Sequence, residues 1–329
     1  MIPVPFAGTG RRPLLALALG GIASSAAAQT WPSRPLRVIV PFSAGGRTDA
    51  MARLIGSAVS SRIGQSVVVE NRTGGGGQVA LQALVQSAPD GHTLMAGSPG
   101  THVYALALYR RPPVNPIEDL RHVTISGAAP LILVVNKDVP ANDLEGFRAL
   151  LAREPGRYDF GSSGVGSSAH IAAVYLLQQL GVSSQHIPFR GSSDALPSLM
   201  AGRVSFIVDT LPFMLEHIRA GAVRPLMVWM AERSPSLPNV PCAVELGRPE
   251  FQAATWTPWS VPKATPEPVV SLLYEQIAAA MRDETVSSRL LEAGNVLTPG
   301  MTPERTQAFI EAEARKWLPI IRASGASAE

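Results

Sequence analysis

A strand, a glycine- or serine-rich loop and a helix follow one another repeatedly along this chain from Leu36 onward. The buried-strand pattern at 37–42 opens the series, and it starts again at 131–135 after an interval. Such alternation predicts parallel sheets flanked by helices. The sequence therefore predicts an α/β fold of two lobes, each with a mainly parallel sheet.

Apolar spacing and turn residues give approximate element limits. Strands are predicted at residues 37–42, 67–69, 92–96, 131–135, 158–160, 186–189, 204–208 and 226–229. Helices are predicted from residue 49 to the stop at Gly64, and at 79–87, 143–153, 168–180, 194–200, 213–220, 269–281, 284–293 and 303–323. A proline-rich loop at 234–249 leads back toward the first lobe. We expect one lobe from 29–127 with 250–329, and the other from 128–249.

The first 28 residues have the pattern of a signal peptide. Arg11 and Arg12 precede a short apolar run, and the small residues 26–28 follow it. This run is about half the ~20 residues that a membrane-spanning helix needs, so we expect cleavage near Ala28 and an exported protein beginning at Gln29. The arginine pair leaves open whether export follows the general secretory route or the twin-arginine route.

Composition excludes several classes of protein. Without the first 28 residues, 26 basic side chains face 25 acidic ones, so no nucleic-acid partner is expected. The single cysteine, Cys242, excludes an intramolecular disulfide, and its proline-rich surroundings indicate a half-buried, unreactive thiol. No later segment is long and apolar enough to span a membrane. The large hydrophobic fraction, 46%, must supply the core.

Two loops of similar composition link a strand to a helix in the two predicted lobes. They occupy residues 41–49 and 160–170. In open parallel sheets, ligands bind beyond the carboxyl ends of strands, where helix N-termini favour an anion. Glycines let the backbone approach the ligand, and hydroxyl groups add donors without a full charge. The pair of loops therefore predicts a site for a small carboxylate.

A third loop at 97–102 follows another strand of the first lobe and could complete this site. Each loop alone could equally be an ordinary turn capped by a serine, threonine or aspartate. The candidate ligand-binding residues are Phe42, Ser43, Ala44, Gly45, Gly46, Arg47, Thr48 and Asp49 in the first loop, Ser162, Ser163, Gly164, Gly166, Ser167, Ser168 and His170 in the second, Ser98, Gly100, Thr101 and His102 in the third, and Arg190 and Asp209 beyond strands of the second lobe.

The charged candidates each have a second interpretation. Arg47 could clamp a carboxylate with two parallel hydrogen bonds, or it could point into solvent. Asp49 is better explained as the cap or first-turn acid of its helix. Asp209 could accept from an amine or hydroxyl of the ligand, or it could cap the next helix. Arg190 could reach the cleft or lie on the surface, and the histidines could satisfy only local backbone groups.

Motifs for catalysis are weak. The segment 164–169 formally matches a dinucleotide fingerprint, but no acidic residue follows about 20 positions later at a strand end. Residues 96–100 form a loose nucleophile elbow in which Pro99 is a poor start for the helix that should follow. The six histidines lack the spacing of a helical zinc pair, so neither a metal nor a cofactor is expected. A secreted serine hydrolase remains the alternative, because triads assemble across the sequence.

Short stretches spread along the chain carry a family resemblance. They are WPSRP at 31–35, IVPF at 39–42 before Gly45-Gly46 and Thr48-Asp49, VVENR at 68–72, APDG at 88–91, GTH at 100–102, ERSP at 232–235 and LPNVP at 237–241. With them the chain resembles the Bug family of solute-binding receptors, which includes the receptors of tripartite tricarboxylate transporters. The resemblance extends in order over nearly the whole chain after residue 30.

This resemblance implies a monomeric periplasmic receptor of the type II, two-lobe kind, with two segments crossing between the lobes. It implies that the loops 42–49 and 162–170 hold one carboxylate of a small solute, partly through water, and that a membrane permease or a sensor kinase reads the closed state. The chain departs from the family pattern at Ser43-Ala44, where prolines are common, and at Arg47, where a small residue is common. Arg47 could add a contact to an anion or exclude a bulkier solute.

Overall fold

One long strand, β4 (Leu120–Asn136), runs through two different parts of the sheet in this computed structural model. Up to Pro130 it pairs with β9 (Ala254–Pro262), and from Leu131 it pairs with β7 (Phe206–Thr210). In the described part of the chain the strand order is β2-β1-β3-β9-β4-β7-β5-β6, with β8 also on β4. The two halves of β4 thereby belong to two lobes that share one strand.

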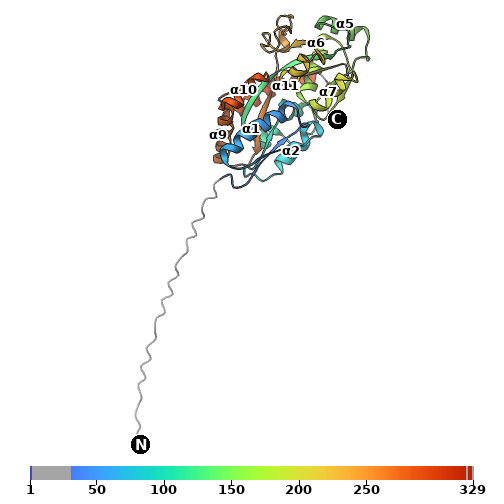
Figure 1. Ribbon diagram of the computed structural model, residues 1–329. Coiled ribbons are helices and arrows are strands. Elements are labelled where there is room, and N and C mark those ends of the chain that lie inside the picture. The colour runs from blue at the N-terminus through green and yellow to red at the C-terminus, as the bar shows by residue number, and fades with distance from the viewer. Residues whose placement is uncertain (2–30, 324, 328–329) are drawn as a thin grey trace. The chain divides into compact units, whose positions relative to one another are not determined.

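The structure describes residues 1, 31–323 and 325–327, and residues 32–329 form one compact unit (Figure 1). The predicted signal peptide and its cleavage site at Ala28 lie outside the described residues. Among those that are described, no helix has the length and apolar character needed to cross a membrane.

The first lobe contains β1, β2 and β3 with the helices that follow them. Its elements are β1 (Leu36–Val40), α1 (Arg47–Ile63), β2 (Val67–Asn71), η1 (Gly75–Gly77), α2 (Gln78–Val85), β3 (Thr93–Ala96), η2 (Gly100–Tyr104), α3 (Ala105–Leu108) and α4 (Pro116–Asp119), joined after β9 by α9 (Glu267–Arg282), α10 (Glu284–Glu292) and α11 (Pro303–Ala323). Helices α9 and α10 pack beside α1 (Figure 1).

The second lobe continues from Leu131. Its elements are α5 (Leu144–Arg153), β5 (Phe160–Ser162), α6 (Ser168–Leu180), β6 (His186–Pro188), α7 (Ser192–Met200), β7, α8 (Leu211–Arg219) and β8 (Val223–Val228), with η3 (Pro249–Phe251) before the return to β9. Local chemistry sets the helix limits: Asp143 and Ser167 cap helix starts with their side chains, and Gly64 and Gly181 end helices in the left-handed conformation.

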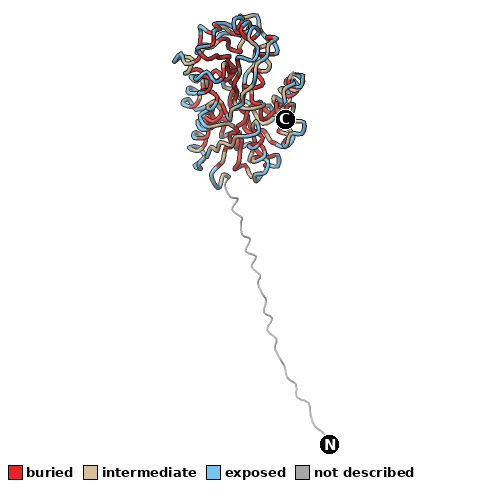
Figure 2. The backbone as a smooth tube through the Cα atoms, turned by 90° about the vertical axis from the view of Figure 1, so that its right-hand side faces the viewer, coloured by how far each residue is buried: buried red, intermediate tan, exposed pale blue. Residues whose placement is uncertain are grey.

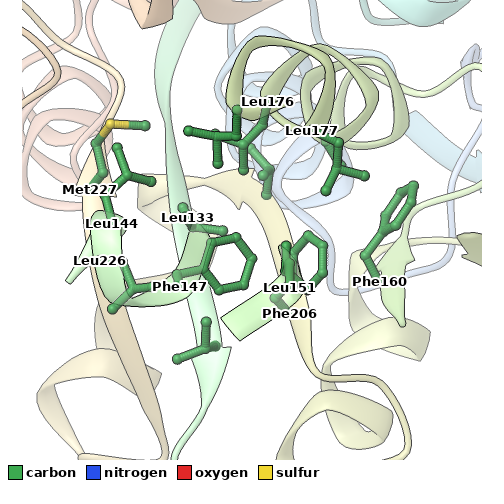
Figure 3. Packing of buried hydrophobic residues seen from close by; sticks show 14 of the residues in the cluster. Leu133, Leu144, Phe147, Leu151, Phe160, Leu176, Leu177, Phe206, Leu226 and Met227 are labelled. Atoms are coloured by element: carbon green, nitrogen blue, oxygen red, sulfur yellow. The ribbon is translucent and has the colours of Figure 1, made fainter. Parts of the chain in front are cut away.

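Apolar side chains form the core between sheet and helices. Figure 2 shows that the buried residues lie in the interior of the molecule and the exposed ones at its outside. In the second lobe, Leu176 and Leu177 of α6 and Phe147 of α5 pack with the strand residues Leu133 and Phe206 (Figure 3). The rings of Phe147 and Phe206 meet edge to face, with centroids 4.9 Å apart. This core fixes the base from which the loop after β5 projects.

Several sequence expectations need correction. Parallel pairing holds for β1 with β2 and β3, and for β5 with β6 and β7, but β4 and β9 pair antiparallel with their neighbours. Neither β9 nor the first half of β4 was predicted, because Gly127 and several prolines interrupt their patterns. A helical turn, η2, does begin directly after Pro99, whose φ of −51° suits a helix start. Cys242 is 1% exposed, thus fully buried.

A buried polar network joins η2 of the first lobe to the two crossing strands, β9 and β4. The Ser260 hydroxyl of β9 lies 2.9 Å from His102 Nε2 and 2.9 Å from His122 Nδ1. Burial lowers the pKa of His102 well below its usual value, and the neighbouring His122 lowers it further. Burial also lowers the pKa of His122 to about 3, and the charge of Lys263 adds to this effect. Both rings are therefore neutral in the folded protein.

These neutral histidines predict a loss of stability in acid. Unfolded histidine titrates near pH ~6.5, so below that pH the unfolded chain binds protons that the folded chain does not. The free energy of unfolding should fall from pH ~6.5 toward the lower folded pKa values, by about 1.4 kcal/mol per pH unit for each such ring. The free energy of unfolding of His122→Gln, measured in urea between pH 4 and 6, should fall less steeply with decreasing pH than that of the unaltered protein. The difference in slope should correspond to one bound proton; an equal slope would contradict the argument.

Candidate functional site

The first glycine loop, between β1 and α1, is held in shape by Asp49. Its Oδ2 accepts from the Gly45 N–H at 2.9 Å, and its Oδ1 accepts from Asn71 Nδ2 at 2.9 Å. Asn71 Nδ2 also donates to the Phe42 carbonyl at 2.9 Å. Burial raises the pKa of Asp49, but the bonds from Arg53, Gly45 and Asn71 outweigh it and bring the pKa below its ordinary value. Asp49 is therefore an ionised first-turn acid that fixes the loop.

The second glycine loop, between β5 and α6, rests on two stacked histidines. The rings of His170 and His186 lie 4.0 Å apart between centroids. His170 Nδ1 accepts from the Gly166 N–H at 3.1 Å, and His186 Nε2 lies 2.7 Å from Ser162 Oγ. Burial lowers the pKa of His170 to about 4, so its Nδ1 keeps the lone pair that this bond requires.

The third loop, residues 97–102, is also held in shape by buried side chains. The Thr101 hydroxyl accepts from the Ser98 N–H at 3.0 Å and lies 2.9 Å from His102 Nδ1. Thr101 and His102 are both fully buried. They support the turn that presents Ser98, and the Ser98 hydroxyl itself has no partner among the described residues.

The first glycine loop touches the second lobe directly at the start of α7. The Ser43 N–H donates to the Arg190 carbonyl at 3.3 Å, and Ser43 Oγ lies 2.7 Å from Ser193 Oγ. Ser193 Oγ also donates to the Ala44 carbonyl at 2.8 Å. A Cβ added to Gly191 would lie 2.0 Å from Ser43 Oγ and 2.8 Å from Ser43 N. Only a glycine permits so close an approach of the lobes at this point.

A second contact between the lobes is made where η1 and η2 of the first lobe approach residues 165–166 of the second glycine loop. A Cβ on Gly100 would lie 2.6 Å from the Gly166 carbonyl oxygen, and one on Gly76 would lie 2.3 Å from the Val165 carbonyl oxygen. The Tyr109 hydroxyl donates to the Gly75 carbonyl at 2.9 Å and so fixes the segment that approaches Val165. The lobes are therefore in direct contact at both ends of the cleft.

Between these contacts lies an inner cavity of about 40 Å³. Its lining combines the two helix starts with several hydroxyl groups: Phe42, Gly46, Arg47, Thr48, Ser98, Leu131, Ser163, Ser168, Ala169, Ser192, Asp209, Thr210 and Thr255. The starts of α1 and α6 both reach it, and each brings partial positive charge. Such a lining suits a small anion with further hydrogen-bonding groups.

An outer cleft of about 660 Å³ adjoins the inner cavity and shares Phe42 and Ser163 with it. Its lining is Pro41, Phe42, Gly74, Gly75, Gly76, Gly77, Tyr109, Ser163, Gly164, Val165, Pro188, Phe189, Arg190 and Asp194. Arg190 and Asp194 are exposed there. The two spaces together could hold a solute whose head group is small and whose remaining part varies.

Arg47 connects the inner cavity to the crossing strands. Its Nε donates to Asn295 Oδ1 at 2.9 Å and its Nη1 donates to Thr257 Oγ1 of β9 at 2.9 Å. Its Nη2 lies 3.5 Å from the carbonyl oxygen of Gly127, where the register of β4 shifts. Burial lowers the pKa of Arg47 to about 10, against the opposing charge of Asp209. The guanidinium therefore stays charged at neutral pH and faces the cavity from a fixed position.

Comparison with known proteins places this chain in a receptor family. Residues 51–326 match the model of the tripartite tricarboxylate transporter family receptor. BugT of Bordetella pertussis is 36% identical over 312 residues, which cover 94% of this chain and 95% of that protein. The chain belongs to this receptor family. The resemblance noted in the sequence is thereby confirmed.

Solved structures give the same result for the fold. MatC of Rhodopseudomonas palustris, with bound malate, superimposes with a TM-score of 0.86 at 32% identity and covers 88% of this chain and 100% of its own. Another R. palustris protein, with adipate, gives a TM-score of 0.86 at 32% identity over 90% of this chain and 98% of its own. The predicted two-lobe binding-protein fold is confirmed.

The receptor brings together eight of the predicted site residues at the inner cavity. They are Phe42, Gly46, Arg47, Thr48, Ser98, Ser163, Ser168 and Asp209. Gly164 and Arg190 line the outer cleft instead. Asp209 lies within β7, one residue before its end, instead of following the strand as predicted, because the strand extends two residues further than its sequence pattern indicates. Its Oδ1 accepts from the adjacent Thr210 N–H at 2.6 Å.

The other predicted residues lie around the cavity and line neither space. Ser43, Ala44, Gly100 and Gly166 form the contacts between the lobes, and Gly45 is held by Asp49. Ser162 and His170 support the second loop, Thr101 and His102 support the third, and Ser167 caps α6 by accepting from the His170 N–H. These are positioning roles that a loop motif alone does not separate from contact with a ligand.

Sequence reasoning missed five residues of the inner cavity. Leu131 and Thr255 belong to the crossing strands, Ala169 and Ser192 to helix starts, and Thr210 to the end of β7. The glycine segment at η1, which is not among the predicted site residues, lines the outer cleft. Thr210 and Ser192 each begin or directly precede a helix after a strand, which is the signal that could have found them.

Closure of the receptor can be tested at Gly191. Its φ of 173° is extended and suits any residue, so Gly191→Ala should fold normally but collide with Ser43 when the lobes close. We expect a larger radius of gyration by small-angle X-ray scattering than for the unaltered receptor. Ser193→Ala removes hydrogen bonds at the same contact without adding bulk, and it should change the radius less. Equal scattering from Gly191→Ala and the unaltered receptor would show that this contact does not limit closure.

Removal of the Arg47 guanidinium should destabilise the receptor. In Arg47→Met, Asn295 Oδ1 and Thr257 Oγ1 lose their donor, and Asp209 loses the positive charge of Arg47, which opposes the rise in its pKa. We expect the free energy of unfolding in urea to fall by about 1–3 kcal/mol. Arg62→Met, at an exposed arginine, is the matched control and should change it by less than about 0.5 kcal/mol. A similar small effect at Arg47 would refute its structural role.

Proposed function

We propose that this chain is a periplasmic receptor that captures a small carboxylate-containing solute between its lobes and catalyses no reaction. The observation that carries the proposal is the inner cavity, where the starts of α1 and α6 and the Arg47 guanidinium meet. Two helix starts and one guanidinium favour a carboxylate, and the hydroxyls of Thr48 and Ser168 can donate to it. The malate and adipate complexes of the R. palustris relatives support this class of ligand.

The size of the two spaces suggests how the solute lies. An inner cavity of about 40 Å³ suits one carboxylate and the carbon next to it, with water where space allows. The rest of the solute would pass between Phe42 and Ser163 into the outer cleft of about 660 Å³. This arrangement accounts for relatives whose ligands differ in length, because only the outer part must change.

The proposed lobes are residues 29–127 with 250–329 and residues 128–249. The change of pairing partner in β4, between Pro130 and Leu131, supports a boundary near this position. Ligand contacts from both lobes would stabilise the closed state over the open one. A membrane permease, or alternatively a sensor kinase, would then bind the closed monomer in preference to the open one.

The hydrolase alternative is less well supported by the geometry of the candidate serines. The Ser98 hydroxyl has no hydrogen-bond partner among the described residues, and the Ser167 hydroxyl caps α6. A serine nucleophile needs a base within hydrogen-bond distance. Ester turnover that disappears in Ser98→Ala, Ser163→Ala or Ser167→Ala would overturn the proposal that the receptor catalyses nothing.

The proposal predicts thermal stabilisation by carboxylates. Binding to the folded state alone should add about 2.7 kcal/mol at a concentration one hundred times the Kd, which raises the Tm by several degrees. The measurement is a thermal-shift assay with malate, succinate, adipate, citrate, aspartate and glutamate. In Thr48→Val, which loses a hydroxyl in the inner cavity, the shift should shrink, and in Ser288→Ala, at the exposed face of α10, it should persist. No shift with any carboxylate would refute the ligand class.

A further inference from the structure

Asp209 is a buried acid with an unused oxygen at the site. It lies near the end of β7, opposite Ile132 of β4, and is 4% exposed. Its Oδ1 accepts from the Thr210 N–H, whereas its Oδ2 has no hydrogen-bond partner among the described residues. A carboxylate can accept about four hydrogen bonds, and a buried one with few donors is costly. Asp209 therefore has capacity for a further donor.

Asp209 belongs to the lining of the inner cavity. Asp209 lines it together with Ser98 and Thr210, which are 5% and 7% exposed and whose hydroxyls also lack partners among the described residues. Three buried polar groups with free bonding capacity around one small space indicate a place built for a polar ligand group. An aliphatic carbon in that position would leave all three unsatisfied.

The charges of the cavity restrict the ligand further. Burial raises the pKa of Asp209, while the nearby hydroxyls of Ser192 and Thr210 and the charge of Arg47 oppose the rise. A carboxylate of the ligand is attracted by Arg47 and repelled by an ionised Asp209. A hydroxyl or ammonium group on the ligand offsets this repulsion, because it donates to Asp209. The small cavity requires this donor to be next to the carboxylate.

We infer that Asp209 selects α-hydroxy and α-amino carboxylates over carboxylates with an unsubstituted α-carbon. The ligand carboxylate lies at Arg47 and the two helix starts, and its α-hydroxyl or α-ammonium donates to Asp209 Oδ2. This inference rests on the proposed function and adds a specificity-determining residue to it. A site that hydrogen-bonds a ligand group discriminates strongly against the analogue without that group, since its own buried partner is then left unpaired.

Two matched series test the inference by isothermal titration calorimetry. Succinate, malate and aspartate share one carbon skeleton and differ only at the α-carbon, as do propionate, lactate and alanine. We expect the hydroxy or amino member of at least one series to bind about tenfold or more tightly than the unsubstituted member. The hydroxy and amino arms also distinguish a neutral donor from a cationic one.

The variant Asp209→Asn keeps the shape and removes the charge. The preferred hydroxy or amino acid should lose about tenfold in affinity, while succinate should bind as well as before or better because repulsion is gone. Asp138→Asn removes an exposed charge of the same lobe outside the cleft and should change neither affinity. A preference that persists unchanged in Asp209→Asn would overturn the assignment.

The outcomes separate this inference from the proposed function. If succinate or propionate binds as tightly as its hydroxy and amino counterparts, the role of Asp209 is wrong while carboxylate binding stands. If no member of either series binds and the wider carboxylate panel also gives no thermal shift, the proposed function fails together with this inference.

Discussion

The pairing of β4 with β9 is the constraint on which the rest of the structure depends. β4 pairs with β9 up to Pro130 and then with β7 and β8, so one continuous strand belongs to both lobes. A backbone ladder resists stretching but can bend where its register shifts, and two such shifts occur, one between His122 and Thr124 and one between Ile125 and Ala128. This strand pair thereby joins the lobes, and the loops after β1 and β5 both line the inner cavity.

Neutral hydrogen-bonding groups support the second and third loops of the site, whereas the ionised Asp49 fixes the first loop. His170 and His186 brace the second loop and His102 braces the third, each in the uncharged form that burial favours. Uncharged supports in these two loops leave the electrostatic potential of the cavity to a few groups: the two helix starts with Asp49 at the first of them, Arg47 and Asp209. A buried charge beneath each loop would cost desolvation energy and would compete with the ligand for the helix starts.

Arg47, which stands where the family commonly has a small residue, makes contacts well beyond its own loop. The side chain bonds to Asn295 and to Thr257 of β9, and it still lines the cavity. It therefore relates the position of the first helix start to the crossing strands and balances Asp209 across the cleft. Neither of its two interpretations from the sequence, ligand clamp or solvent-exposed arginine, included this position at the hinge.

The sequence by itself determined the α/β class, the limits of α6 and α11, and the two glycine loops that reach the cleft. These follow from periodicity, caps and turn residues, which act within a few neighbouring positions. It did not determine β9, because proline and polar residues mask a strand whose two neighbours come from distant parts of the chain. Only the tertiary structure decided that Asp209 faces Arg47, that Asp49 and His102 support loops, and that Gly191 meets Ser43. Those relations depend on long-range packing between lobes, for which a local pattern carries no signal.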